Sequence, residues 1–351
     1  MTALRRFGPV GTIALLVALG AGALGAYQAR RASIVHTALP TPVDPVATFS
    51  IVGYDPETGD LGIAVQSKFF AVGSVVPWAR AGVGAVATQS YANTAYGPDG
   101  LAQLDAGDDA EAVVNALTEI DDDRALRQLG IVDAQGNAAA FTGDACLAWA
   151  GHRVGTHYAA QGNILAGPEV VDAMATTFET TKGDLASRLT AALSAGQAAG
   201  GDVRGRQSAA LLVVRAGAGY GGNDRYIDLR VDDHPAPIRE LRRLMRLREA
   251  QLASGEARRA LRAGEHADAL AAAKRVVTLD PEDANGWMLL ARIHVARNEM
   301  DAAGEAGRQA LVLDPWLKTA TLRGLGDTAL IERLLESEVF ARIWETINSD
   351  G

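Results

Sequence analysis

Residues 47–73 read ATFSIVGYDPETGDLGIAVQSKFFAVG, and this stretch decides the fold expected for the chain. Residues 48–52 alternate polar and apolar side chains, which is typical of a half-buried β-strand. Residues 55–59, DPETG, predict a turn, because proline fixes φ at a central position and glycine tolerates positive φ. Residues 61–65 return as a second strand. We therefore predict a hairpin whose first strand begins at Thr48.

A threonine in this place permits an unusual kind of catalysis. A cut between Ala47 and Thr48 would give Thr48 a free α-amino group, whose ordinary pKa is about 8. Such an amine takes the proton from the threonine's own hydroxyl, so one residue supplies nucleophile and base. In the uncut chain the same nitrogen is an amide and cannot act as a base. The alternative, which spacing by itself favours, is that Thr48 is an ordinary β-branched strand residue.

The stretch and four later segments, in the same order, resemble the bacterial family known as domain of unknown function 1028. The later segments are RQLGIVDAQGNAAAFTG (127–143), QGNILAGPEVVDAM (161–174), AGGDVRGRQSAALLVV (199–214) and DLRVDDHPAPIRELRRL (228–244). The resemblance spans about 200 residues, from Thr48 to Met245. It implies a grouping with the N-terminal-nucleophile hydrolases, which have an αββα sandwich and a terminal Thr, Ser or Cys as nucleophile. It implies no particular substrate.

The order of the remaining patterns fits that implied fold. Strands, helices, strands, helices and strands follow one another, which indicates packed antiparallel sheets and not a βαβ alternation. We predict an α+β fold, a four-layer αββα sandwich over residues 48–250. Its further strands are expected at 71–76, 83–88, 129–132, 138–141, 207–215 and 226–231. Helices are expected near 97–106, after a cap at Asp108 or Asp109, and over the apolar stripes at 170–178 and 185–193.

The end of the chain contains an internal repeat. Leu-Asp-Pro at 279–281 recurs at 313–315, 34 residues later, and Gly264 corresponds at the same offset to Asn298. This period resembles the tetratricopeptide repeat. We predict that residues 251–351 form helical repeats with a capping helix at 331–347, with Trp287 buried between the repeat helices. A protein partner for residues 251–347 is expected on this basis.

The start of the chain predicts export. Residues 7–27 are a 21-residue stretch without charge, and arginines lie on both sides of it. As a helix it would span roughly 30 Å, about one hydrocarbon core of a membrane. We predict a signal peptide or transmembrane anchor over residues 1–31 and a proline-containing linker over 32–47. The body of the protein is then expected to be membrane-anchored, periplasmic or extracellular.

Charge and composition exclude some functions. The 351 residues carry a formal net charge of −9, and the excess of acidic groups lies after residue 47. An acidic body argues against binding to nucleic acid through phosphate contacts. Cys146 is the single cysteine, so the chain has no internal disulfide, and its apolar neighbours indicate a structural thiol.

The resemblance implies a cation and a carboxylate around the nucleophile, and two cations are candidates. Ser67 and Lys68 end the second strand, and Arg80 follows at the point where a lysine stands in the proteasome-like pattern. Arginine differs from lysine there because it does not exchange a proton near neutral pH. The same pattern has an aspartate where this chain has Gln66. The alternative is that Lys68 and Arg80 are surface charges at strand ends.

A polar, glycine-rich loop at 200–208, GGDVRGRQS, leads into an apolar strand. Glycines allow backbone to approach a ligand closely. We predict Asp202 and Ser208 as supports for Thr48, with a structural turn as the alternative interpretation. Substrate or oxyanion contacts are expected from amide and guanidinium side chains. These are Gln89, Asn163, Arg204 and Gln207.

The acidic runs do not predict a metal site. Asp228, Asp232, Asp233 and His234 are better explained as the cap of the next helix, and residues 121–123 as a solvated loop. We predict no metal and no cofactor. The leading hypothesis is an exported hydrolase that cleaves an amide or related acyl bond, with an unidentified amide-containing substrate. The rival is a non-catalytic binding module on the same fold, and the state of the bond before Thr48 discriminates between them.

Overall fold

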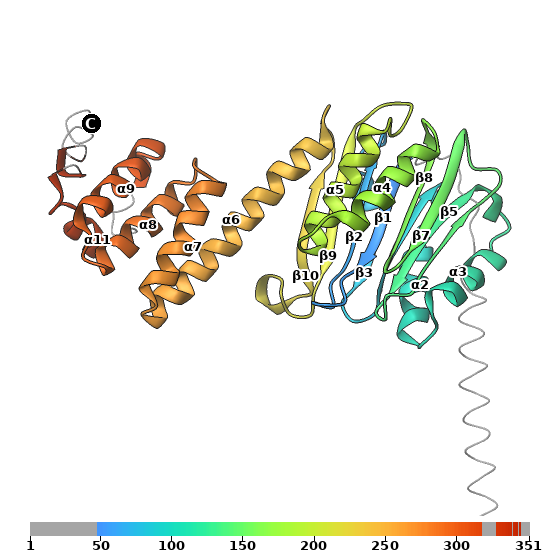
Figure 1. Cartoon of the computed structure of the whole chain (residues 1–351), viewed down its shortest axis with the longest axis horizontal. Helices are drawn as coiled ribbons and strands as arrows, with labels where there is room; N and C mark the ends of the chain where they lie inside the picture. Colours follow the sequence, from blue (N-terminus) through green and yellow to red (C-terminus); the bar gives the residue numbers. More distant parts are fainter. Residues whose placement is uncertain (1–47, 318–327, 339, 343, 345–351) are drawn as a thin grey trace, which may run out of the picture. The chain divides into compact units, whose positions relative to one another are not determined.

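The computed structural model describes residues 48–317, 328–338, 340–342 and 344. An α+β domain with two antiparallel sheets and flanking helices is followed by paired helices (Figure 1). The predicted signal or anchor at 1–31, with its membrane stretch at 7–27, and the linker at 32–47 lie outside the described residues. Among the helices that are described, none has the length and apolar character needed to cross a membrane.

The larger sheet contains the predicted hairpin. Its order is β10-β9-β2-β1-β8-β7, and Thr48 pairs with Ser67 at one end of the hairpin while Tyr54 pairs with Leu61 at the other. The hairpin prediction is confirmed. The strands are β1 Thr48–Tyr54, β2 Leu61–Ser67, β7 Trp149–Gly155, β8 Tyr158–Leu165, β9 Ser208–Val214 and β10 Arg225–Val231.

The smaller sheet packs face to face against the larger one. Its order is β3-β4-β5-β6, and apolar side chains such as Val52, Val65 and Ala87 share one core cluster between the sheets. This arrangement leaves alternate residues of each strand facing the opposite sheet. The strands are β3 Pro77–Arg80, β4 Gly84–Ser90, β5 Arg127–Asp133 and β6 Ala138–Thr142.

Helices flank the two sheets. Helices α4 Pro168–Thr180 and α5 Leu185–Ala198 cover the outer face of the larger sheet, where Phe49 packs with Met174 and Leu189 (Figure 1). Helices α2 Tyr96–Asp105 and α3 Ala110–Glu119 pack against the smaller sheet. Asp109 caps α3 by accepting from Ala112 N at 2.8 Å, as expected. The prediction of two antiparallel sheets with flanking helices is confirmed. Three short 3-10 helices complete the domain, at Val72–Ser74, Arg124–Leu126 and Tyr220–Gly222.

One strand prediction was wrong, and some strands were missed. Residues 71–76 form a short helical turn and not a strand, because Ala71 adopts φ 54° and the chain turns there. Strands β7 and β8 were not predicted, since glycine and polar residues at 161–163 interrupt the apolar pattern of β8. Strand β8 nevertheless pairs with β1, at the centre of the larger sheet.

The helical region begins with a long helix that belongs to two cores. Helix α6 runs over Pro237–Ala263; Leu241 packs in the core of the sheet domain and Ala257 in the core of the repeats. The predicted boundary after residue 250 therefore lies inside α6. Trp287 is partly buried against the repeat core. The further helices are α7 His266–Leu279, α8 Ala284–Ala296, α9 Met300–Leu313 and α11 Thr328–Leu334. Residues 339, 343 and 345–347 of the predicted capping helix lie outside the described part.

Candidate functional site

Four polar residues stand in one row across the end of the larger sheet. Thr48 on β1 pairs with Ser67 on β2, which pairs with Ser208 on β9. The register of β1 with β8 continues to Asn163 on the other side of Thr48. Alternate residues of a strand point to the same face of a sheet. Val52, Val65 and Leu212 lie in the core between the two sheets, so Thr48, Ser67 and Ser208, an even number of residues away on the same strands, also face the smaller sheet. Asn163 does so for the same reason, since Ala159 on its strand lies in that core. All four residues are fully buried.

The hydroxyl of Thr48 lies against a second hydroxyl. Thr48 Oγ1 donates to Ser67 Oγ at 3.2 Å, and the carbonyl oxygen of Thr48 accepts from Gln89 Nε2 at 3.3 Å. The predicted residues Thr48, Ser67 and Gln89 are therefore brought together from both sheets. These contacts are polar and buried.

A network of neutral amides fills the space beside this row. Ser50 Oγ donates to Gln89 Oε1 at 2.6 Å and accepts from Gln161 Nε2 at 2.7 Å. Gln89 Nε2 also donates to Gln128 Oε1 at 2.8 Å. The sequence analysis did not identify Ser50 or Gln128. A signal existed, because both are polar residues at inward positions of strands that also place the apolar Val52 and Val132 inward.

Two acceptors in this network have no hydrogen-bond partner among the described residues. Asn163 Nδ2 donates to Gln128 Oε1 at 2.9 Å, but Asn163 Oδ1 and Gln161 Oε1 are buried and unpaired. An unsatisfied buried acceptor costs about 1–3 kcal/mol, so native proteins retain few of them. The row thus includes an amide that a bound donor would satisfy.

The glycine-rich loop is tied to the end of β2. Asp202, whose side chain is fully buried, accepts from Lys68 N at 3.0 Å and forms an ion pair with Arg204 at 3.0 Å. Lys68, the residue after Ser67, is exposed. Asp202 and Arg204 therefore hold the loop against the strand end, and Asp202 also bridges to Leu165 at the end of β8.

Ser208 and Gln207 also fix neighbouring segments. Ser208 Oγ donates to Phe69 O at 2.5 Å and accepts from Val72 N at 3.1 Å, which holds the turn after β2. Gln207 N donates to Ser67 O at 3.0 Å, while Gln207 Nε2 donates to Asp233 at 3.1 Å. The side chain of Gln207 is thus engaged outside the row.

The structure does not bring Arg80 to Thr48. Arg80 pairs with Gly84 at the far end of β4, five residues or about 17 Å from Gln89. Its exposed guanidinium forms an ion pair with Asp105 at the end of α2. Arg80 is therefore not the cation beside Thr48. The spacing of the proteasome-like pattern places it at the opposite end of the strands.

Left-handed backbone conformations are concentrated at the Thr48 end of the sheets. Among the described residues other than glycine, six have positive φ, and four of these lie in the loops or strand ends around the row. Ile164 is the least expected, since a β-branched residue is an outlier at φ 53°. Strained residues of this kind cluster at functional sites. The four are Ala71, Ser90, Ala148 and Ile164.

The acidic run before α6 is occupied by ion pairs, and the expectation that it caps this helix was wrong, because Ala236 stands at the N-cap without a side-chain cap. Asp228 pairs with Arg225, Asp232 pairs with Arg230, and His234 Nδ1 accepts from Ala236 N at 2.9 Å. Within the described residues, no group of three or more His, Cys, Asp or Glu side chains could hold a metal ion.

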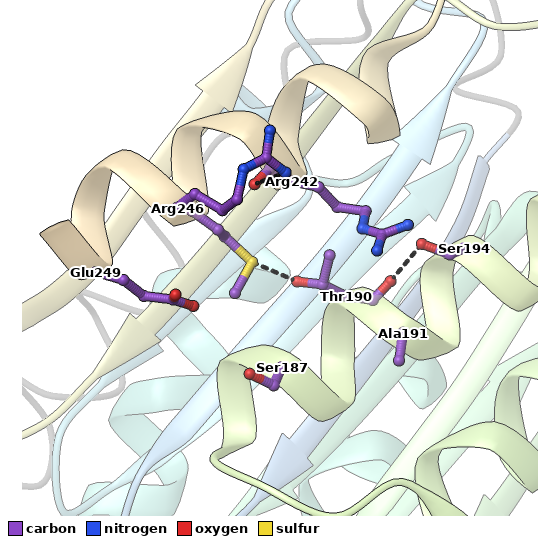
Figure 2. Close-up of a pocket in the computed structure, with 8 residues that line it drawn as sticks. Ser187, Thr190, Ala191, Ser194, Arg242, Arg246 and Glu249 are labelled. Carbon is purple, nitrogen blue, oxygen red and sulfur yellow. Dashed lines mark hydrogen bonds between the residues drawn. The ribbon is translucent and has the colours of Figure 1, made fainter. Parts of the chain in front are cut away.

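A cavity of about 420 Å³ lies elsewhere, between α5 and α6 (Figure 2). Its floor includes Thr190, whose hydroxyl contacts Met245 Sδ at 2.9 Å. None of the predicted site residues lines it, so it is separate from the row at Thr48. Its lining is Ser187, Thr190, Ala191, Ser194, Arg242, Met245, Arg246 and Glu249.

Comparisons with known proteins agree with this architecture. The model of a family of unknown function, DUF1028, matches residues 48–241, and a tetratricopeptide-repeat model matches residues 255–315. A search of curated proteins found no match. The crystal structure of protein SPO2555 from Silicibacter pomeroyi, described as a DUF1028 protein, is similar with 36% identity and a TM-score of 0.53, covering 59% of this chain and 89% of that one. The chain therefore belongs to the DUF1028 family and continues into a tetratricopeptide-repeat region.

Proposed function

We propose that residues 48–250 act as an N-terminal-nucleophile hydrolase with the four-layer αββα sandwich of that class. Thr48 is the nucleophile, and the bond cleaved is an amide or a related acyl bond. The observation that carries the proposal is the buried row of Asn163, Thr48, Ser67 and Ser208 at the start of β1. The concentration of left-handed backbone around the row supports it further.

The reaction begins once the bond before Thr48 has been cut. Thr48 Oγ attacks the acyl carbon while the α-amine takes the hydroxyl proton, and the amine then gives this proton to the leaving nitrogen. An acyl ester on Thr48 remains. A water molecule, deprotonated by the same amine, attacks the ester, releases the carboxylic acid and restores the threonine.

Other residues of the row have supporting roles in this proposal. Ser67 Oγ, 3.2 Å from Thr48 Oγ1, orients the hydroxyl. Asn163 lies beside Thr48 in register, and a turn of its amide would offer Nδ2 to the developing oxyanion. Lys68, next to Ser67, is the cation retained from the prediction, while Asp202, Arg204 and Ser208 hold the loops in place.

The test is an intact-mass measurement combined with an acyl-trapping electrophile. Wild-type protein should begin at Thr48 and carry one adduct on that residue. Thr48→Ser should retain partial activity, because serine also joins a hydroxyl to an α-amine, and Thr48→Ala should take no adduct. Active protein that retains residues preceding Thr48 would remove the α-amine from the mechanism.

The second candidate is a binding module without catalysis. The observation that favours it is the neutral amide network, in which Gln161 Oε1 and Asn163 Oδ1 remain unpaired acceptors. In an uncut chain these would bind a ligand through its donors while Thr48 stays inert. Ligand binding by uncut protein without turnover would support this candidate.

A further inference from the structure

Three exposed apolar side chains surround the Thr48 end of the larger sheet. Phe70 is 62% exposed, Val203 is 58% exposed and Leu147 is 46% exposed. They come from three different loops, which follow β2, precede β9 and precede β7. Single exposed apolar residues are normal on a protein surface, whereas larger apolar patches mark binding sites, so the question is whether these three loops lie together.

Main-chain bonds join these loops to one another. Val203 N donates to Ile164 O at 3.0 Å, and Ile164 N donates to Leu147 O at 3.1 Å. Asp202, the neighbour of Val203, accepts from Lys68 N, two residues before Phe70. The three residues therefore stand on one connected rim of hydrogen-bonded backbone, with Ile164 directly after Asn163.

The loops that carry the rim are held in fixed conformations. Ala71 follows Phe70 and Ala148 follows Leu147, and both adopt left-handed φ near 54°. Ser208 Oγ fixes the loop of Phe70 by donating to Phe69 O. The ion pair of Arg204 with Asp202 fixes the loop of Val203. In a rim built on such loops the backbone is already ordered, so binding needs to order only the side chains.

We propose that this rim binds an apolar acyl chain, so that the preferred substrate is an amide of a medium-length aliphatic or aromatic carboxylic acid. The inference rests on the proposed function of Thr48. Apolar lining with a few convergent polar groups is the usual construction of a small-molecule site, and here the polar groups are Thr48, Asn163 and Gln161. Each additional methylene that contacts the rim should raise kcat/KM, by about two- to fourfold.

The experiment uses the full chain and a series of acyl p-nitroanilides, from acetyl to octanoyl. With wild-type protein kcat/KM should increase along the series. Phe70→Ser, Leu147→Ser and Val203→Ser should each flatten the increase while the acetyl compound is cleaved as before. Val154→Ser is the matched control, since Val154 is 44% exposed on β7 near the opposite end of the strand. It should leave the increase unchanged.

A binding measurement separates this inference from the proposed function. Affinity for octanoyl and acetyl anilides is measured with Thr48→Ala protein, in which no acyl transfer is expected. Tighter binding of the octanoyl compound, lost in Val203→Ser, supports the rim even if no compound is hydrolysed. Equal affinity for both compounds, or equal losses from Val203→Ser and Val154→Ser, overturns the rim. Absence of hydrolysis by wild type with binding intact overturns the hydrolase alone.

Discussion

Gly130 on β5 lies directly opposite the side chain of Gln161 on β8. A Cβ atom at position 130 would stand 2.3 Å from Gln161 Oε1, so only glycine leaves room for this amide between the sheets. Gln161 in turn donates to Ser50 at 2.7 Å. The close approach of the two strands at Gly130 therefore permits the polar network to form beside Thr48.

Gly130→Ala should disturb the network without unfolding the domain. The added methyl group must displace the end of Gln161, and overpacking of this kind costs about 1–3 kcal/mol. We expect a lower melting temperature and, if Thr48 is the nucleophile, slower labelling by an acyl-trapping electrophile. Gly82→Ala is a useful comparison, because a Cβ there meets no neighbour, although its positive φ adds strain. Unchanged stability and labelling in Gly130→Ala would contradict the role assigned to Gln161.

Ser67→Ala and Ser208→Ala should have different effects, one mainly on the reactivity of Thr48 and the other mainly on the stability of the domain. Ser208 Oγ satisfies Phe69 O and Val72 N, so its loss leaves two backbone groups without that partner and should destabilise the domain by about 1–3 kcal/mol. Ser67→Ala should change the melting temperature less and reduce the labelling rate of Thr48 more. Urea unfolding and labelling kinetics measure the two effects. The reverse order of effects would contradict the roles given to the two hydroxyls.

The sequence allowed the β1–β2 hairpin to be predicted because its turn chemistry and alternation are local. It also singled out residues that the fold brings near one another, although their roles stay predictions. Thr48, Ser67, Asn163 and Ser208 share a row of the larger sheet, and Gln89 reaches Thr48 from the smaller sheet. The amide network was not predicted, because pairing across the sheets depends on which strands become neighbours. Strand β8 illustrates the difficulty: glycine and polar residues at 161–163 interrupt its apolar pattern, yet it pairs with β1 inside the larger sheet.

Arg80 failed as a site residue for a related reason. The number of residues between Thr48 and Arg80 does not tell at which end of the sheets Arg80 lies. The hairpin between β3 and β4 turns at residues 81–83, and this carries Arg80 toward Asp105. Long-range placement of this kind requires the sheet topology.

The stability of the smaller sheet should depend on pH through Asp121. Burial would raise the pKa of this carboxyl, but hydrogen bonds from Arg127, Tyr96 and Asn93 outweigh it and lower the pKa from 3.8 to about 2. A pKa that is lower in the folded state adds stability above the unfolded value, and this is lost as the pH falls toward the folded value. Between about pH 4.5 and pH 2, the free energy of unfolding of wild type should fall by on the order of 2 kcal/mol relative to that of Asp121→Asn.

Urea unfolding across this pH range measures the difference. Asp122→Asn serves as a control for the loss of one charge. Parallel curves of unfolding free energy against pH for wild type and Asp121→Asn would contradict the prediction.

Gly264 and Asn298 are equivalent helix ends in the two repeat units, 34 residues apart. Both adopt left-handed φ, 76° at Gly264 and 59° at Asn298, and the following residue of each donates to a carbonyl five residues earlier, Glu265 N to Ala260 O and Glu299 N to His294 O. This is the pattern of a helix C-cap, in which glycine carries no steric penalty and asparagine a smaller one than most residues.

Substitutions at these two positions should therefore change the stability of the repeat region in opposite directions. Gly264→Ala should destabilise the repeat region by about 1–2 kcal/mol, because alanine is forced into the left-handed conformation. Asn298→Gly should be neutral or stabilising by up to about 1 kcal/mol, because it removes that strain at the second cap. Chemical unfolding followed by far-ultraviolet circular dichroism measures both changes, and Gly255→Ala inside α6 serves as the control in which glycine replacement should stabilise. If Asn298→Gly lowers stability as much as Gly264→Ala does, the asparagine side chain makes a specific contact and the two caps are not equivalent.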